Sequence, residues 1–298
     1  MINESKLIER ATPPSRENDK SSYTYNFIKY LLLEKFWSEV DIFLQWSYAN
    51  STNIKKDSDI DIVVCDKNIY YDNIYHLSDI EKNNYYKYER QNSYSFFQFK
   101  ESIRNFLELH FPSKVEKKNK CIRINLQNEK YVDVDIVPCF FYRRFTRYKA
   151  PNDCYYYEWI EFISEENKHI KSFPKIHKKN GETKNQSTDG IYKDIVRIIK
   201  NSKKYLVDNW KMDEKLISSF MIECCVRNIN NNIFNWTSYK NIVNNVMEAI
   251  YSDMKNKEKR EKYVEVCDLF YLFKWNRNKN TPQEVMTFLE EIYYLMNK

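Results

Sequence analysis

The chain has 298 residues, of which 48 are basic and 42 acidic, so its net charge is a mild +6. Its charged and hydrophobic shares, 30% and 42%, are those of a folded protein, and no apolar run reaches the roughly 18 residues that cross a bilayer. Only two glycines occur, which excludes both the Walker A loop and the G-x-G-x-x-G loop. The polar N-terminus lacks the apolar centre of a secretory signal, so we expect a cytoplasmic protein.

The cysteines and histidines are too few and too irregularly spaced to predict disulfides or a zinc site. The seven cysteines contain no C-x-x-C pair, and only four histidines accompany them. A disulfide framework or a structural zinc site requires regular spacing of such ligands. We therefore expect reduced thiols.

The N-terminal half mixes helical and strand patterns. Apolar residues at three- and four-residue steps predict an amphipathic helix over residues 17–40, and a short strand over 42–45 follows. After a polar loop, residues 59–65 alternate, so Asp59 and Asp61 share the face opposite the apolar side chains.

A second pair of strands follows in the chain. A helix is predicted over 94–111, and two alternating segments at 122–126 and 132–138 flank a polar turn. They are typical of a hairpin whose second strand carries Asp133 and Asp135 on one face.

The C-terminal half is helical in pattern. Residues 171–190 hold both glycines, a proline and many Lys and Asn residues, and we predict a loop or linker there. The fold class is therefore α+β, with a mixed domain over 1–180 and an all-helical lobe over 181–298. The helices of this lobe are predicted at 191–207, 213–229, 239–252, 259–273 and 282–296.

Ser47 and three carboxylates form the main functional pattern. Residues 48–58 separate Ser47 from Asp59, and Asp61 follows two positions later on the same strand face. A third carboxylate from another strand, Asp135 or its neighbour Asp133, can complete a set of oxygen ligands for Mg²⁺. Such a set is suited to nucleotide transfer.

This pattern resembles the signature of the polymerase β nucleotidyltransferase superfamily, and more closely that of the bacterial CD-NTases. These are relatives of cyclic GMP-AMP synthase and oligoadenylate synthase with a SMODS-type nucleotidyltransferase domain. The resemblance implies a polymerase β-like palm followed by the helical lobe. It is carried by Pro13-Pro14-Ser15, by the segments 57–61 and 135–138, and by two helical segments, 195–200 and 217–223.

The resemblance also implies the roles of the site residues. Asp59, Asp61 and Asp135 would be catalytic and would hold two Mg²⁺ ions, with Mn²⁺ as a substitute. Asp135 is favoured over Asp133 because it directly precedes a hydrophobic pair and a proline. Residues Ser47, Lys200 and Ser219 would hold the triphosphate, and Phe220 would stack on a base; otherwise Lys200 is a solvated helix residue and Phe220 a core residue.

The implied activity is the condensation of NTPs into a cyclic di- or oligonucleotide second messenger for antiphage signalling. We expect a monomer without membrane association, with a downstream effector that senses the product and with RNA as an activator. Two alternatives stay open: nucleotide transfer to an RNA, protein or small-molecule acceptor, and a catalytically weak RNA- or nucleotide-binding pseudoenzyme. Trp46 motivates the last, because the family usually has glycine there and an indole adds bulk beside the triphosphate.

Overall fold

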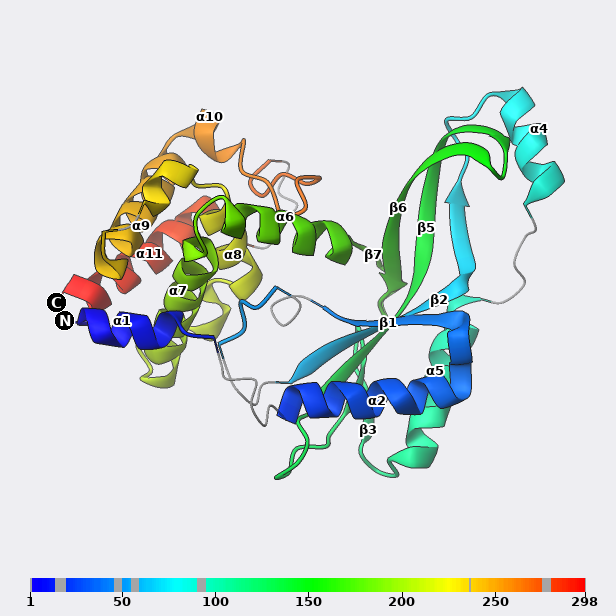
Figure 1. Cartoon of the computed structure of the whole chain (residues 1–298), viewed down its shortest axis with the longest axis horizontal. Helices are drawn as coiled ribbons and strands as arrows, with labels where there is room; N and C mark the ends of the chain where they lie inside the picture. The colour runs from blue at the N-terminus through cyan, green and yellow to red at the C-terminus, as the bar shows by residue number, and fades with distance from the viewer. Residues whose placement is uncertain are drawn as a thin grey trace. The chain divides into compact units, whose positions relative to one another are not determined.

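The chain divides into two compact units that alternate along the sequence (Figure 1). The helical unit contains Met1–Ser15, Trp46–Lys55 and Pro174–Lys298, and the sheet unit contains Arg16–Gln45 and Lys56–Phe173. We expected one division after residue 180, whereas the units interleave. The structure, a computed structural model, describes residues 2–13, 20–45, 50–54, 59–89, 95–235, 237–274 and 280–297, apart from the side chain of Ile69.

One mixed sheet forms the sheet unit. Its strand order is β1-β2-β5-β4-β3, while β6 pairs with the later part of β5 and β7 pairs with β6. The central β2–β5 pair is parallel, and the other pairs are antiparallel. The strands are β1 (Val40–Leu44), β2 (Ile60–Asn73), β3 (Val115–Lys117), β4 (Ile122–Ile124), β5 (Val134–Ala150), β6 (Asp153–Ile163) and β7 (His169–Ser172).

Helices α2 (Lys20–Phe36) and α5 (Phe96–His110) pack against each other in this unit. The ring of Phe36 meets those of Phe99 and Phe106 edge-on at 5.8 and 6.2 Å between centroids, a favourable aromatic geometry. A capping box at Ser95 starts α5. The helix predicted over 17–40 is present as α2 but ends at Phe36, and the strand predicted over 42–45 is present as β1 but begins at Val40. The 3₁₀ turn η1 (Trp37–Glu39) lies between them.

The far end of the sheet is a long ribbon of β5 and β6, beside which α4 (Asp79–Tyr88) lies (Figure 1). An ion pair ties the ribbon to β2: Arg143 donates from Nε and Nη2 to the two carboxylate oxygens of Asp72, at 2.8 and 2.7 Å. Such bidentate pairs are strong because both hydrogen bonds are charge-assisted.

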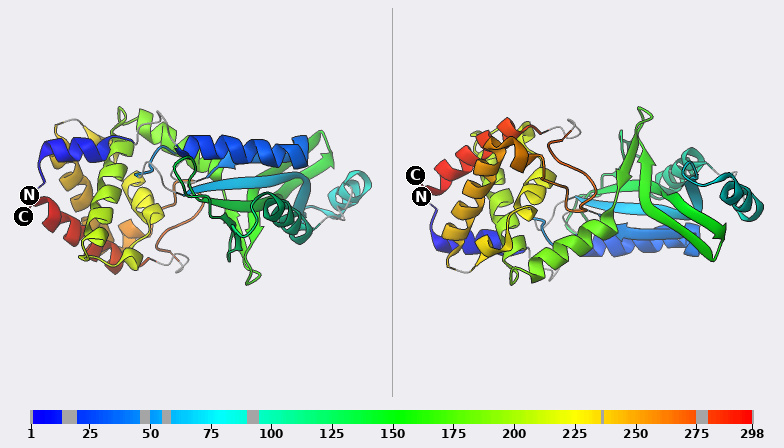
Figure 2. Two further views of the ribbon diagram at one scale, coloured as in Figure 1. Left: turned by 90° about the horizontal axis from the view of Figure 1, so that it is seen from below. Right: turned by 90° about the horizontal axis from the view of Figure 1, so that it is seen from above.

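The helical unit is built around a continuous apolar core. Helix α7 supplies Ile195, Val196, Ile198 and Ile199, all almost fully buried, so its sides pack against neighbouring helices. The helices are α1 (Glu4–Ala11), α6 (Pro174–Gln186), α7 (Ile191–Asp208), α8 (Ser219–Arg227), α9 (Tyr239–Lys255), α10 (Lys257–Arg260) and α11 (Pro282–Asn297), with 3₁₀ turns η2 (Glu214–Leu216) and η3 (Asn231–Phe234) (Figure 2).

Two secondary-structure predictions for this unit were wrong. The loop predicted over 171–190 is mostly helix α6, because Pro174 suits a first helical position and the left-handed Gly190, with φ of 87°, comes only after the helix. The helix predicted over 259–273 ends early, at Arg260. Beyond it the chain turns at Asp268, with φ of 62°, and Val264 pairs with Tyr271 in an isolated bridge.

Within the described residues, no helix combines the length and apolar character that a membrane crossing requires.

Candidate active site

Two carboxylates lie side by side at the start of the parallel β2–β5 pair. The strand register places Asp61 directly beside Asp135. Asp59 comes two residues before Asp61, and side chains two apart on an extended chain point to the same side. The structure therefore brings three of the residues predicted from the sequence, Asp59, Asp61 and Asp135, to one end and one face of the sheet.

An arginine that the sequence did not single out lies among these carboxylates. Arg123 is paired with Asp135 across the antiparallel β4–β5 ladder. Its Nη2 donates to Oδ2 of Asp59 at 2.7 Å and to Oδ2 of Asp133 at 3.0 Å, and its Nη1 lies 3.5 Å from Oδ1 of Asp135. Its Nε donates to Oδ1 of Asn125 at 3.2 Å.

The two candidates for the third ligand have different surroundings. Both oxygens of Asp133 accept hydrogen bonds, from the backbone N–H of Gln127 at 2.8 Å and from Arg123 at 3.0 Å. Oδ1 of Asp135 is buried without a hydrogen bond, although the Arg123 guanidinium stands near it. A buried acceptor without a donor is costly unless a cation or water takes the place. Asp135 thus has the open coordination site that Asp133 lacks.

Burial and mutual repulsion perturb the acidic group. Burial, and then the charges of Asp135 and Asp59, raise the pKa of Asp61 to about 7. Burial also raises the pKa of Asp135, against the opposing effect of Arg123. Hydrogen bonds to Asp59 are the main reason that the pKa of Arg123 is raised, so this side chain stays cationic. Asp59, Asp61 and Asp135 repel one another, and this repulsion favours the binding of cations.

The donor chemistry of this cluster fits Mg²⁺, which takes carboxylate oxygens together with substrate phosphates and water. The open Oδ1 of Asp135 and the register of Asp61 with Asp135 support that fit. The arrangement is nevertheless not a ready cation cage, because in the described part of the chain no three acidic, histidine or cysteine side chains are gathered for one ion. Arg123 reaches between Asp59, Asp133 and Asp135 instead.

Two of the residues predicted from the sequence lie outside the described residues: Ser47, predicted to bind triphosphate, and Trp46, at the position where glycine is usual. The segment 50–54 that follows them is described, and it belongs to the helical unit. The backbone carbonyl of Ser51 accepts a hydrogen bond from Nη1 of Arg197 on α7 at 2.5 Å.

Glu223 of α8 is the centre of a buried polar cluster in the helical unit. Its Oε1 accepts hydrogen bonds from Nδ2 of Asn50 at 2.9 Å and from Nε2 of His177 at 3.0 Å. Its Oε2 accepts from Oγ1 of Thr52 at 2.8 Å and from Nζ of Lys200 at 2.9 Å. Burial alone would raise the pKa of Glu223, but Lys200 and His177 hold it well below the usual range.

Lys200, predicted to grip the triphosphate, lies inside this cluster. Its side chain is 3% exposed, and Nζ also donates to the carbonyl and hydroxyl oxygens of Thr52, at 3.3 and 3.1 Å. An ammonium has three N–H donors, and these contacts use them. In this arrangement Lys200 supports the segment 50–54, and the solvated-helix alternative does not describe it.

Ser219 and Phe220 open helix α8. Ser219 is exposed at the first helical position, where unpaired backbone N–H groups favour negative charge. Phe220 is partly buried against the helical core, and its ring centroid lies 5.8 Å from that of His177. Phe220 therefore borders the Glu223 cluster within the same unit, and Ser219 directly precedes it on α8.

Sequence reasoning missed Arg123, Asn50 and His177 as members of these two clusters. A signal existed for Arg123, since it stands on the polar side of the first strand of the predicted hairpin. No local pattern marks Asn50 or His177, whose contacts to Glu223 span 173 and 46 residues of sequence.

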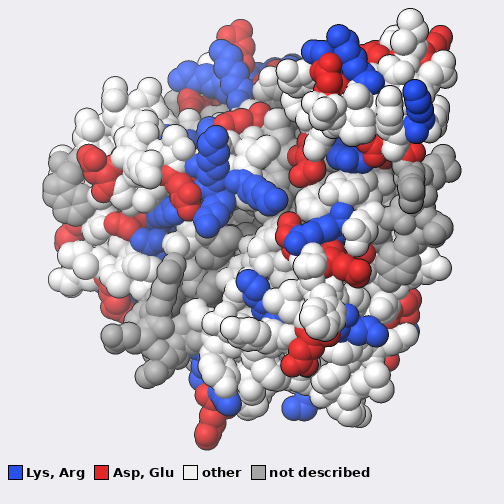
Figure 3. All heavy atoms as spheres, turned by 45° about the vertical axis from the view of Figure 1, so that its right-hand side comes forward, with Lys and Arg blue, Asp and Glu red and all other residues white. Residues whose placement is uncertain are grey.

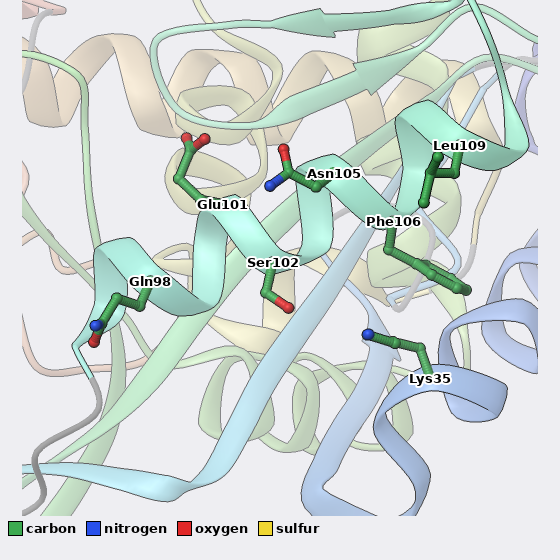
Figure 4. A pocket seen from close by; sticks show the side chains of 7 residues that line it. All are labelled: Lys35, Gln98, Glu101, Ser102, Asn105, Phe106 and Leu109. Atoms are coloured by element: carbon green, nitrogen blue, oxygen red, sulfur yellow. The ribbon is translucent and has the colours of Figure 1, made fainter.

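Acidic and basic side chains are interspersed on the face shown in Figure 3, as the mild net charge of +6 suggests. A groove of about 560 Å³ lies between α2 and α5, where Lys35 points toward Ser102 and Phe106 (Figure 4). None of the residues that line it belongs to the acidic cluster. None of the seven cysteines, all of which lie in the described part of the chain, forms a disulfide.

Comparison with known proteins gives the same picture over the whole chain. Residues 179–297 match the family model of the cGAS/DncV-like nucleotidyltransferase C-terminal helical domain. A cyclic dipurine nucleotide synthase of Elizabethkingia meningoseptica is 37% identical, over 98% of this chain and 97% of its own length. Cyclic nucleotide synthase CdnE01 of Staphylococcus haemolyticus is 29% identical, over 88% and 86%.

Solved structures of cyclic dinucleotide synthases are similar to this chain over nearly its full length. The E. meningoseptica CdnE cyclic dinucleotide synthase, determined with GTP and Apcpp, has a TM-score of 0.81 at 35% identity and covers 100% of both chains. The Rhodothermus marinus CdnE c-UMP-AMP synthase, determined with Apcpp and Upnpp, has a TM-score of 0.83 at 24% identity over 99% and 96% of the chains, and supports the α+β fold. Similarity over nearly the full length shows that this chain belongs to the CD-NTases, the cGAS/DncV-like family of nucleotidyltransferases.

Proposed function

We propose that this CD-NTase condenses two purine NTPs into a cyclic dinucleotide that acts as a second messenger in antiphage defence. The observation that carries the proposal is the register of Asp61 with Asp135 on neighbouring parallel strands, with Asp59 two residues before Asp61. The choice of purines rests on the relative that is 37% identical and named a cyclic dipurine nucleotide synthase, and on the GTP and Apcpp in its structure.

Asp59, Asp61 and Asp135 are the residues that we assign to two Mg²⁺ ions, for which Mn²⁺ can substitute. Such ions lower the pKa of an attacking hydroxyl and neutralise charge that builds up on the phosphates. The open Oδ1 of Asp135 supports its place in this set. Burial, and then repulsion from Asp135 and Asp59, raise the pKa of Asp61 to about 7, and a bound cation would offset both effects.

The triphosphate contacts are proposed for Ser47, Ser219 and Lys200, and Phe220 is proposed to stack on a base. For Ser219 the support is its exposure at the N-terminus of α8, where negative charge is favoured. For Lys200 the contacts to Thr52 suggest that it acts largely by holding the segment 50–54. Thr52 comes five residues after Ser47 in the sequence.

The proposal is tested by incubating the purified protein with ATP and GTP, singly and together, in Mg²⁺ or Mn²⁺. We expect a phosphatase-resistant product whose mass is that of a cyclic purine dinucleotide. UTP and CTP serve as matched substrates, and a product made only from them would contradict the purine assignment. Products that appear only when an RNA, protein or small-molecule acceptor is added would favour the transfer alternative.

The other partners and the location are part of the same proposal. We place the reaction in the cytoplasm, where NTPs are available and cysteines without disulfides, such as these seven, stay reduced. A monomeric enzyme, an effector that senses the product, and activation by RNA complete the scheme. Added RNA should raise the rate less as salt increases, because phosphate contacts weaken with ionic strength.

Trp46→Gly is expected to lower the KM for NTP, because glycine removes the side-chain bulk beside the proposed triphosphate site. Initial rates over a range of ATP and GTP concentrations measure this effect. An unchanged KM and kcat would mean that the indole does not obstruct the substrate. Binding of NTP without any turnover in either protein would instead favour the pseudoenzyme alternative.

A further inference from the structure

Arg123 makes two kinds of contact in the sheet unit. Two of its partners are groups that we do not assign to the metal: Asp133, at 3.0 Å from Nη2, and Asn125, at 3.2 Å from Nε. Its other partners are proposed metal ligands: Asp59, at 2.7 Å from Nη2, and Asp135, at 3.5 Å from Nη1. One guanidinium thus bridges the supporting residues and the metal-binding residues.

We propose that Arg123 is an internal counter-cation that holds Asp59 and Asp135 in the metal-free enzyme and competes with divalent ions for them. A carboxylate oxygen that accepts a hydrogen bond from a guanidinium has less electron density and less room to offer a metal ion. A divalent ion at Oδ2 of Asp59 would have to replace the hydrogen bond from Arg123, and one at Oδ1 of Asp135 would stand against the nearby guanidinium. The inference rests on the proposed metal site.

The remaining contacts explain how Arg123 can release two carboxylates without leaving the site. Asp133 is itself fixed by the backbone N–H of Gln127, at 2.8 Å, and Asn125 is fixed by donating to Oε1 of Glu116 at 2.6 Å. These two residues can keep the guanidinium next to the sheet while its contacts to Asp59 and Asp135 exchange. The 3.5 Å approach to Asp135 is the looser of the two, outside hydrogen-bond distance.

Competition has two consequences that a purely structural arginine does not have. Without metal, Arg123 offsets repulsion among the clustered carboxylates and stabilises the fold. With metal, the same positive charge opposes the incoming cation, so the affinity for divalent ions is lower than the carboxylates alone would give. Removing the charge should therefore weaken the metal-free protein and tighten metal binding together.

The test is Mn²⁺ binding to the full-length protein without nucleotide, measured by calorimetry or by the EPR signal of free Mn²⁺. Arg123→Gln is expected to bind Mn²⁺ more tightly, on the order of tenfold, the scale of removing a few partly exposed charge contacts. In EDTA its Tm should be lower than that of the wild type, and Mn²⁺ should raise its Tm by more. Arg123→Lys, which keeps the charge, should bind Mn²⁺ close to the wild-type level.

Asp133→Asn separates the anchoring role of Asp133 from a ligand role. In an otherwise wild-type protein this substitution should weaken Mn²⁺ binding, because Arg123 loses one partner and interacts more strongly with Asp59 and Asp135. In the Arg123→Gln background the substitution should have a much smaller effect on Mn²⁺ binding. Mn²⁺ affinity that is unchanged or reduced in Arg123→Gln, while Asp61→Asn still abolishes binding, would overturn the competition and leave the metal site standing. Absence of Mn²⁺ binding in every variant would overturn the metal site itself.

Discussion

Asp61→Asn should lower the rate of cyclic dinucleotide formation by at least about 10²–10³-fold, the scale on which loss of one charge-stabilising group acts in a transition state. An amide keeps the shape of the side chain but removes the negative charge that the proposed Mg²⁺ ions need. Asp61 stands in register with Asp135, so its loss affects the centre of the acidic cluster. Initial rates by mass spectrometry of the product, at saturating ATP and GTP, measure the effect.

Loss of activity in this variant should not come with loss of stability. The pKa of Asp61 is raised to about 7, above the ordinary aspartate value of about 3.9. Ionised Asp61 therefore destabilises the metal-free fold above about pH 7, and that penalty disappears as the pH falls toward 4. In EDTA at pH 8, we expect Asp61→Asn to have a higher Tm than the wild type. An inactive variant with a lower Tm would point to misfolding instead of metal loss.

Glu223→Ala should reduce the free energy of unfolding by about 3–5 kcal/mol, the usual result of breaking a buried ion pair from one side. The substitution leaves the ammonium of Lys200 buried beside Thr52 without its counter-charge. Urea unfolding followed by circular dichroism measures the loss. Glu248→Ala is a matched control, because Glu248 is exposed on α9 of the same unit, and its effect should stay within about 0.5 kcal/mol.

The pH dependence gives a second measure of the Glu223 cluster. Because the pKa of Glu223 is depressed in the fold, its charge stabilises the protein above the unfolded value of about 4.3, and that contribution is lost as the pH falls below it. The stability difference between the wild type and Glu223→Gln should therefore shrink below about pH 4.3. A difference that stays constant down to pH 3 would contradict the ion pair with Lys200.

Much of the fold follows from local patterns in the sequence. The strand at residues 59–65 and the hairpin carrying Asp135 are confirmed. Burial alternates only where the two strands begin, at Asp61 and Asp135; from Ile62 and Ile136 onward both faces are buried. The helix over 191–207 is confirmed because its apolar side packs into the core. Composition was a weaker guide: the Lys- and Asn-rich stretch with Gly181 is a helix, since glycine weakens a helix without forbidding it.

Of the candidate site, only the residues within short sequence motifs could be predicted. The three aspartates and Ser47 stand in spacings that the resemblance recognises, whereas the partner of each carboxylate depends on which strands lie together. Arg123 meets Asp59 over 64 residues of sequence, and Glu223 meets Thr52 over 171. The family resemblance predicted that Lys200 binds the triphosphate. Its burial beside Glu223 could be found only from the packing of α7 and α8. Its direct contact with a nucleotide stays a prediction.

The alternation of the two units along the chain limits which parts of this protein can be exchanged with those of a relative. The chain enters the helical unit at its start, again at Trp46–Lys55, and finally at Pro174. Leu7 and Ala11, from the first of these segments, are buried in the helical core with residues beyond position 190. A recombination event at any one point would therefore supply a helical core with parts from two parents. We therefore expect a chimaera that exchanges only the part beyond Pro174 to have a less well packed helical core than either parent.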